Sequence, residues 1–246
     1  MTDLACKRAL VTVGTRHVGG AIALALAERG ADIVISYETP SECAAEIIAR
    51  VESLGGRCRA LQADGTNPGE VKRLVEDAVA WMGGLDILVT NSGEALEDFP
   101  CEESLEAIAS FLCSNVRRAV LATMAATSHM RAGGRIVMIG SGAICAPPGK
   151  GVLSSTVEAA HRGFTKGMAR QLKPREITVN LVQPASAHAS PGAEESCSAD
   201  RDQRSLPSRQ HGDAVEILAA MVAFVASPQA ALMTGSIIAA DGGFDA

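Results

Sequence analysis

Aromatic side chains are scarce in this chain: they make up 3% of its 246 residues, with one tyrosine and one tryptophan. Few platforms for stacking on bases or sugars are therefore available. Basic residues are also in deficit, because 22 Lys and Arg face 28 Asp and Glu and the formal net charge is -6. Nucleic acids and anionic membranes attract clustered Lys and Arg, so neither is an expected partner.

Long apolar runs and paired cysteines are missing as well. No apolar stretch approaches the ~20 residues that a membrane-spanning helix needs, and residues 1–8 lack the charged-then-apolar order of a secretory signal. The 7 cysteines include no C-x-x-C pair, which removes a common arrangement for zinc or dithiol chemistry, and no metal site is expected. We expect a cytoplasmic protein whose thiols are free.

Apolar segments of strand length alternate with segments of helical periodicity along most of the chain. Strands are predicted over residues 9–13, 33–37, 59–62, 85–90, 135–140, 177–183 and 236–240, and helices over 19–29, 41–54, 68–81, 105–129, 153–172 and 214–226. This alternation predicts an α/β fold over residues 1–246: a single-domain Rossmann-type three-layer sandwich with a doubly wound parallel sheet. Residues 185–212, rich in Ser, Pro and mixed charges, are predicted to form a mobile lid-like segment.

Several short motifs follow one another in a fixed order: ALVT at 9–12, AD at 63–64, DILVTNSG at 86–93, GRIV at 134–137, ITVN at 177–180 and DGG at 241–243. In this order they resemble the short-chain dehydrogenase/reductase family, in the style of its ketoacyl-reductase branch, over the whole chain. The resemblance implies that Asp64 contacts the adenine of a nicotinamide dinucleotide. It also implies that Asn91 belongs to the family's Asn-Asn-Ala-Gly segment at the cofactor.

The loop after the first strand departs from the family pattern T-G-x-x-x-G-x-G. Its three glycine positions carry Val13, His17 and Gly19, with Gly14 one place late. A β-branched valine resists positive φ, and the ring of His17 stands where phosphate would pass, so the loop is predicted to bind a dinucleotide poorly. The alternative is that a protonated His17, helped by Arg16, pairs with the phosphates.

The end of the second strand leaves the choice of nucleotide open. Tyr37 stands where NAD-selective members usually carry an Asp, and Glu38 would repel the 2′-phosphate of NADP. We therefore expect no tightly bound cofactor, while weak binding of NAD(P) remains open.

The catalytic positions depart further from the family. The resemblance implies a set of Asn, Ser, Tyr and Lys, for which this sequence has Asn115, Ser141, Ser154 and Glu158. A serine hydroxyl does not titrate near neutral pH, and a carboxylate raises the pKa of a neighbouring acid where an ammonium lowers it. No catalytic set is therefore predicted to be intact: Asn115 and Ser141 are vestigial, and Ser154 and Glu158 are degenerate.

Three functions remain open. The first is a non-catalytic (pseudoenzyme) subunit that pairs with an active paralogue in a hetero-oligomer, such as a heterotetramer, to form an NAD(P)-dependent hydroxyacyl-type dehydrogenase complex. The inactive subunits of heteromeric dehydrogenases in this family are similar in size and in their losses. The second is non-redox chemistry (cyclisation, dehydration or isomerisation) with Glu158, His161, Ser141 and Asn115. The third is a weakly active NAD(P)H-dependent reductase. The chain could also pair with itself.

Overall fold

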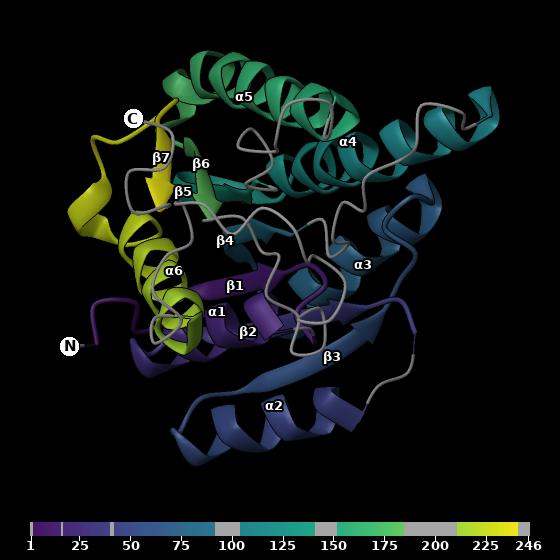
Figure 1. Cartoon of the computed structure of the whole chain (residues 1–246). Coiled ribbons are helices and arrows are strands. Elements are labelled where there is room, and N and C mark those ends of the chain that lie inside the picture. Colours follow the sequence, from purple (N-terminus) through teal and green to yellow (C-terminus); the bar gives the residue numbers. More distant parts are fainter. Residues whose placement is uncertain are drawn as a thin grey trace.

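The computed structural model describes residues 2–15, 17–39, 42–91, 104–140, 152–184 and 211–240. They form an α/β fold around one sheet in the spatial order β3-β2-β1-β4-β5-β6-β7 (Figure 1). All neighbouring strands are parallel: β1 (Arg8–Val11), β2 (Asp32–Tyr37), β3 (Cys58–Gln62), β4 (Leu85–Thr90), β5 (Met130–Ile139), β6 (Thr178–Pro184) and β7 (Ile237–Ala240).

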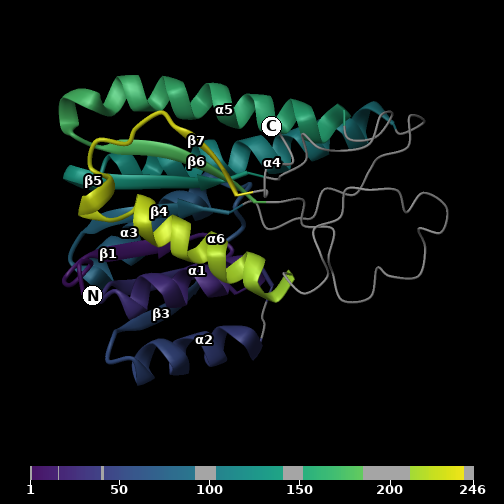
Figure 2. The same ribbon diagram turned by 60° about the vertical axis from the view of Figure 1, so that its left-hand side comes forward.

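Helices cover both faces of this sheet (Figure 2). One face carries α1 (His17–Glu28), α2 (Glu42–Ser53) and α6 (His211–Val225), and the other carries α3 (Pro68–Met82), α4 (Leu105–Thr127) and α5 (Val152–Leu172). Two short 3-10 helices, η2 (Lys173–Arg175) and η5 (Pro228–Ala230), precede β6 and β7.

The alternation of side chains along each strand builds the two cores. On β1, Ala9 and Val11 join the core beneath α1 and α6, whereas Leu10 joins the core beneath α3, α4 and α5. The same period of two places Ile33 and Ile35 of β2 in the first core. Because both faces are buried, the strands read as nearly continuous apolar runs, which is typical of a parallel sheet.

Local sequence signals set the ends of helix α3. The side chain of Asn67 accepts hydrogen bonds from the backbone N–H groups of Gly69 and Glu70, and Pro68 occupies the first helical turn. Gly83 ends the helix at a φ of 77°, a left-handed conformation that glycine adopts without steric cost.

The predicted fold is confirmed, with differences at element boundaries. Strand β5 begins at Met130 rather than Arg135, because Met130 already pairs with Leu85 before an irregularity in the β4–β5 register. The predicted lid over residues 185–212 lies outside the described residues up to 210, and its last two residues belong to α6.

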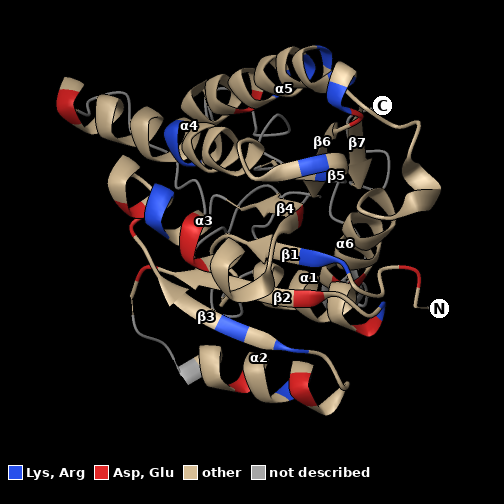
Figure 3. Ribbon diagram, turned by 180° about the vertical axis from the view of Figure 1, so that it is seen from behind, with Lys and Arg blue, Asp and Glu red and all other residues tan. Residues whose placement is uncertain are grey.

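Ion pairs join the ends of the strands opposite the carboxyl edge. Arg8 at the start of β1 binds Asp86 of β4, and Arg57, just before β3, binds Asp32 of β2. Figure 3 shows basic and acidic residues interspersed on the side of the molecule that it presents. None of the helices within the described ranges has the length and hydropathy that crossing a membrane requires.

Candidate functional site

The order of the strands defines where a ligand would bind. Strand β1 lies between β2 and β4, so the succession of strands reverses at this point. Open α/β sheets bind ligands outside the carboxyl ends of their strands at such a switch point. Thr12 joins the two strand ends there: its backbone N–H donates to Val89 O at 3.0 Å, and its hydroxyl accepts from the Asn91 N–H at 3.0 Å.

The turn after β1 keeps a tight backbone although valine stands at the first glycine position. Val13 has a φ of 51°, which costs a residue with a Cβ atom about 1–2 kcal/mol. Two hydrogen bonds from the turn to Ser36 of β2 hold this conformation: Val13 N–H donates to the Ser36 hydroxyl at 3.1 Å, and Gly14 N–H donates to the Ser36 carbonyl at 2.9 Å. This φ is unfavourable for valine, as expected, and the two hydrogen bonds to Ser36 stabilise it.

Gly14 and Gly19 allow this turn to pack closely. A Cβ atom on Gly14 would lie 2.7 Å from the Ile35 side chain, and one on Gly19 would lie 2.4 Å from the Val13 carbonyl oxygen. Both positions therefore require glycine for packing alone. Arg16 and the side chain of His17 lie outside the described residues, so the predicted pairing of His17 with phosphate is not described.

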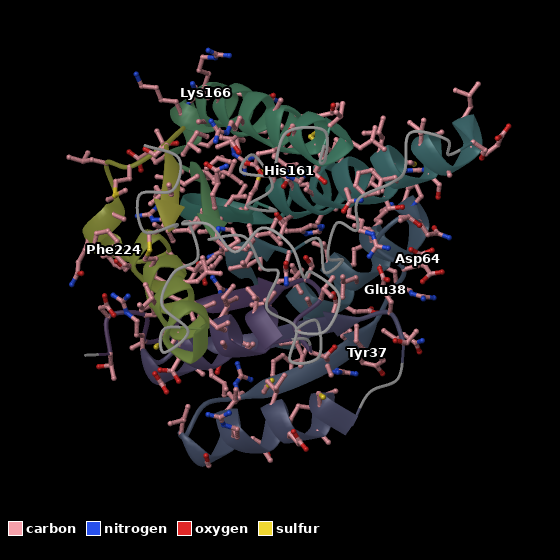
Figure 4. All side chains as sticks on the ribbon, in the orientation of Figure 1. Tyr37, Glu38, Asp64, His161, Lys166 and Phe224 are labelled. Carbon is pink, nitrogen blue, oxygen red and sulfur yellow. The ribbon has the colours of Figure 1, made fainter. Side chains whose placement is uncertain are left out.

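The carboxyl ends of β2 and β3 carry acidic residues. Asp64 Oδ1 accepts hydrogen bonds from the backbone and the hydroxyl of Thr66 at 2.8 and 2.7 Å, and these bonds lower the pKa of Asp64. Glu38 Oε1 accepts from the guanidinium of Arg118 on α4 and from Gly65 N at 3.3 Å. Figure 4 shows Glu38, Asp64 and Tyr37 on the same side of the molecule, with His161 set apart from them.

Helix α5 brings Glu158 to the carboxyl end of β5. The Glu158 side chain is fully buried, and its Oε1 accepts a 2.6 Å hydrogen bond from Gln183 Nε2 at the end of β6. Arg162 joins the same group: its NH2 donates to Gln183 Oε1 at 3.0 Å, and its Nε lies 3.8 Å from Glu158 Oε1. We call Glu158, Gln183 and Arg162 the carboxylate network.

The carboxylate network is packed against the sheet. A Cβ atom on Gly140, the residue that follows β5, would lie 2.8 Å from Glu158 Oε2 and 3.3 Å from Gln183 Cγ. The Glu158 carboxylate therefore lies against the backbone of Gly140, where only a glycine leaves room for it. The Glu158 side chain therefore connects α5 to the ends of β5 and β6.

His161 and Asn115 link helices α4 and α5. His161 Nε2 lies 3.2 Å from the Asn115 backbone oxygen, and the Asn115 side chain donates to Phe111 O at 2.9 Å. His161 Nδ1 is buried without a hydrogen-bond partner among the described residues. Burial lowers the pKa of His161, against the opposing influence of the Glu158 charge and the Asn115 carbonyl. A neutral imidazole therefore donates from Nε2.

The structure brings some of the predicted site residues together. Asn115, Ser154, Glu158 and His161 are all buried on α4 and α5, and Gly14, Gly19 and Asn91 lie near the switch point. Ser141 lies outside the described residues. Tyr37 ends β2, apart from His161, and Lys166 is exposed on α5 and points away from the sheet (Figure 4).

Three residues of this region were missed at the level of sequence: Gln183, Arg162 and Arg118. Gln183 carried one usable signal, its position as a polar residue at the end of a predicted strand, where the carboxyl edge is expected. Arg162 follows Glu158 at the i, i+4 spacing that favours ion pairs on a helix. Nothing in the sequence near Arg118 indicates its partner.

The buried His161 predicts a pH dependence of stability. Its pKa is lowered in the folded protein from an ordinary value of 6.5, so below that pH the unfolded chain binds a proton that the folded chain does not. Stability is therefore present above pH 6.5 and is lost as the pH falls. As the pH falls from about 7.5 to about 5.5, we expect the contribution of His161 to stability to decrease.

Urea unfolding at the two pH values checks this expectation. His161→Gln, whose amide can still donate to Asn115 O, should remove most of the loss. His129→Gln is the matched control, because His129 lies near the carboxyl end of α4 beside α3, and it should keep the wild-type dependence. An unchanged pH dependence in His161→Gln would contradict the assignment.

Comparisons with known proteins give the family. A family model described as enoyl-(acyl carrier protein) reductase matches residues 14–245. A hydroxynaphthalene reductase of Aspergillus fumigatus is 32% identical over 249 aligned positions, covering 94% of this chain and 90% of that protein. The chain belongs to the short-chain dehydrogenase/reductase family.

Solved structures agree with this assignment. A short-chain dehydrogenase from Burkholderia cenocepacia in complex with NADP is 36% identical, with a TM-score of 0.85, and the match covers 99% of each chain. A blue fluorescent protein from a metagenomic library, in complex with NADPH, is 33% identical with a TM-score of 0.84, covering 99% of this chain and 100% of that one. Both neighbours hold a 2′-phosphorylated dinucleotide.

Proposed function

We propose that this chain is a non-catalytic subunit that pairs with an active member of its family and completes an NAD(P)-dependent hydroxyacyl-type dehydrogenase. One observation carries the proposal. The residue that the family register puts in the place of the catalytic lysine, Glu158, is a buried carboxylate tied to Gln183 and Arg162 and packed on Gly140. The Glu158 side chain is therefore part of the protein interior.

The chemistry of the neighbouring positions supports the same proposal. Carbonyl reduction needs a proton donor whose pKa lies near the working pH, and the family register puts Ser154 where that donor would stand. Ser154 is buried on α5. A cation near a phenol lowers its pKa, whereas the Glu158 carboxylate has the opposite sign. The residues at this end of the site do not fit the reacting ring of a nicotinamide cofactor.

Non-redox chemistry receives less support from the same geometry. A Glu158–His161 acid–base pair would need both side chains free to meet a substrate. Glu158 Oε1 instead accepts from Gln183, and His161 Nε2 lies against the Asn115 carbonyl. Both groups make hydrogen bonds inside the protein and hold α5 in place.

The proposed partner surface is the pair α4 and α5. These helices lie side by side on one face of the sheet (Figures 1 and 2), and three large apolar side chains on them are exposed: Leu105, Met124 and Val152. Assemblies of family members commonly pack these helices across a two-fold axis, which favours a heterotetramer. The dehydrogenase for 2-[hydroxy(phenyl)methyl]-succinyl-CoA is the kind of heteromeric complex that the proposal describes.

Co-expression tests this proposal. The chain is produced with an intact family member encoded by a neighbouring gene, and the mass of the purified complex is measured under native conditions. We expect a complex that contains both polypeptides. Met124→Glu, which places a charge on the exposed face of α4, should weaken it, whereas Leu54→Glu at the far side of the sheet should not.

A different outcome would contradict the proposal. If the chain purified alone reduces a 3-oxoacyl thioester with NADPH at the rate of the intact member, it is an enzyme in its own right. If Leu54→Glu disrupts the complex as strongly as Met124→Glu, α4 is not the contact surface.

A further inference from the structure

The buried face of helix α5 is mostly polar up to Thr165. Four buried polar side chains recur there at the spacing of one helix face: Ser154, Glu158, His161 and Thr165. The apolar cluster that joins α4 to this stretch is small, and its buried members are Ala119, Met138 and Leu181. The amino-terminal half of α5 therefore depends strongly on hydrogen bonds for its position.

His161 connects this polar face to helix α4. Its Nε2 lies 3.2 Å from the Asn115 backbone oxygen, where α5 faces α4 (Figure 4). Its Nδ1 is buried and has no hydrogen-bond partner among the described residues. A neutral imidazole donates from one nitrogen, whereas the protonated ring carries N–H donors on both. The second N–H of a protonated His161 would be buried without an acceptor in the part of the chain that the structure describes, which is unfavourable.

The charged neighbours of His161 on its own helix are Glu158 and Arg162. Arg162 Nε lies 3.8 Å from Glu158 Oε1, and the same carboxylate oxygen accepts a hydrogen bond from Gln183 of β6. The carboxylate would attract a proton on His161, but the cation beside it offsets this attraction.

The other elements packed against this part of α5 offer His161 no carboxylate within the described ranges. On α4, Asn115 presents its carbonyl oxygen, and Arg118, one turn further, is hydrogen-bonded to Glu38, a residue set apart from His161 (Figure 4). Strand β5 presents the uncharged Met138. A proton on His161 would therefore leave this buried polar layer with an uncompensated positive charge.

We propose that His161 is an acid-sensitive contact, and that its protonation separates the amino-terminal half of α5 from α4. In the neutral state, Nε2 donates to Asn115 and the two helices pack together. In the protonated state, Nδ1–H reaches an acceptor only when α5 moves away from α4 and water enters. Histidine is the side chain that changes charge in the range of about pH 5 to 8.

The movement of α5 would also regulate assembly, because α4 and α5 form the proposed partner surface. Met124 on α4 and Val152 on α5, both exposed, keep their relative positions only while the helices stay packed. Acid would therefore release the partner subunit. This consequence rests on the proposed function, whereas the movement of α5 is a property of the chain alone.

Hydrogen–deuterium exchange of the full chain alone tests the movement. Exchange is measured at about pH 7.5 and about pH 5.5 and corrected for the intrinsic effect of pH on the exchange rate. We expect residues 152–165 to lose protection at the lower pH, while α3 keeps its protection. His161→Gln, whose amide can still donate to Asn115 O, should protect α5 equally at both pH values. The matched control, His129→Gln, should behave as the wild type does.

Nuclear magnetic resonance gives a second measurement that needs no variant. The shift of the His161 ring Cε1–H is followed over the same pH range, and the loss of protection in α5 should coincide with its titration. Three results would overturn the proposal: titration of His161 without loss of protection, no titration down to about pH 5.5, or an equal loss in α3 and α5. The last of these means that the whole fold opens together.

The co-purified complex separates this inference from the proposed function. We expect the complex to dissociate at about pH 5.5 and His161→Gln to prevent the dissociation. A complex that persists while α5 opens would mean that the partner binds away from α4 and α5. If no complex forms at any pH, the proposed function fails, and the exchange measurement still decides whether His161 moves α5.

Discussion

Glu158→Lys is expected to lower the free energy of unfolding by about 3–5 kcal/mol, the cost of leaving buried charge without its partner. Under the proposed function, the substitution would restore the lysine that the family uses for catalysis. Here it removes the acceptor of the 2.6 Å hydrogen bond from Gln183 Nε2 and places an ammonium group beside Arg162. The longer side chain would also meet the backbone at Gly140, against which the carboxylate already lies.

Urea unfolding of Glu158→Lys and its matched control decides this point. Glu158→Gln keeps an oxygen that can accept from Gln183, so its loss should be about 1 kcal/mol, close to one hydrogen bond. If Glu158→Lys unfolds at the wild-type urea concentration, the carboxylate network does not hold α5 to the sheet. The interior would then still accept the family's lysine.

The fold could be predicted because its signals are local. Alternating residues such as Ile33, Val34 and Ile35 reach opposite cores, and a strand period of two is legible over a few residues. The start of β5 at Met130 was missed because residues 131–134 include Arg and two Gly, which do not suggest a strand. Their inclusion depends on pairing between Met130 and Leu85.

The site could be predicted only in outline. The register that puts Ser154 and Glu158 on one buried face of α5 follows from helical spacing. Their partners do not, because Glu158 meets Gln183 and Glu38 meets Arg118 across chain separations of 25 and 80 residues. Such pairs depend on which helix covers which strand and on the direction in which each side chain points.

Backbone conformation was the second property that could not be predicted from the sequence. Valine avoids positive φ in general, so Val13 indicated a loop unlike that of its family. Hydrogen bonds from the turn to Ser36 hold Val13 at a φ of 51°. Propensity was overridden there by contacts with a neighbouring strand, which a local pattern does not contain.

We also expect the isolated chain to have a greatly reduced rate of carbonyl reduction. A positioned general acid contributes about 10²- to 10⁴-fold to a proton-transfer step. Under the proposed function, Ser154 takes the place of that acid and the buried carboxylate of Glu158 takes the place of the cation that tunes it. The isolated chain should therefore reduce a 3-oxoacyl thioester at least ~10²-fold more slowly than an intact family member.

The most direct measurement is NADPH oxidation by the purified chain alone, with the co-purified complex and the intact partner assayed at equal subunit concentration. We expect turnover by the complex and by the partner, and a rate for this chain at least ~10²-fold lower. If the isolated chain turns over at the partner's rate and Glu158→Gln does not change that rate, a proton donor outside the Ser154–Glu158 pair operates. That result would contradict the proposed non-catalytic role.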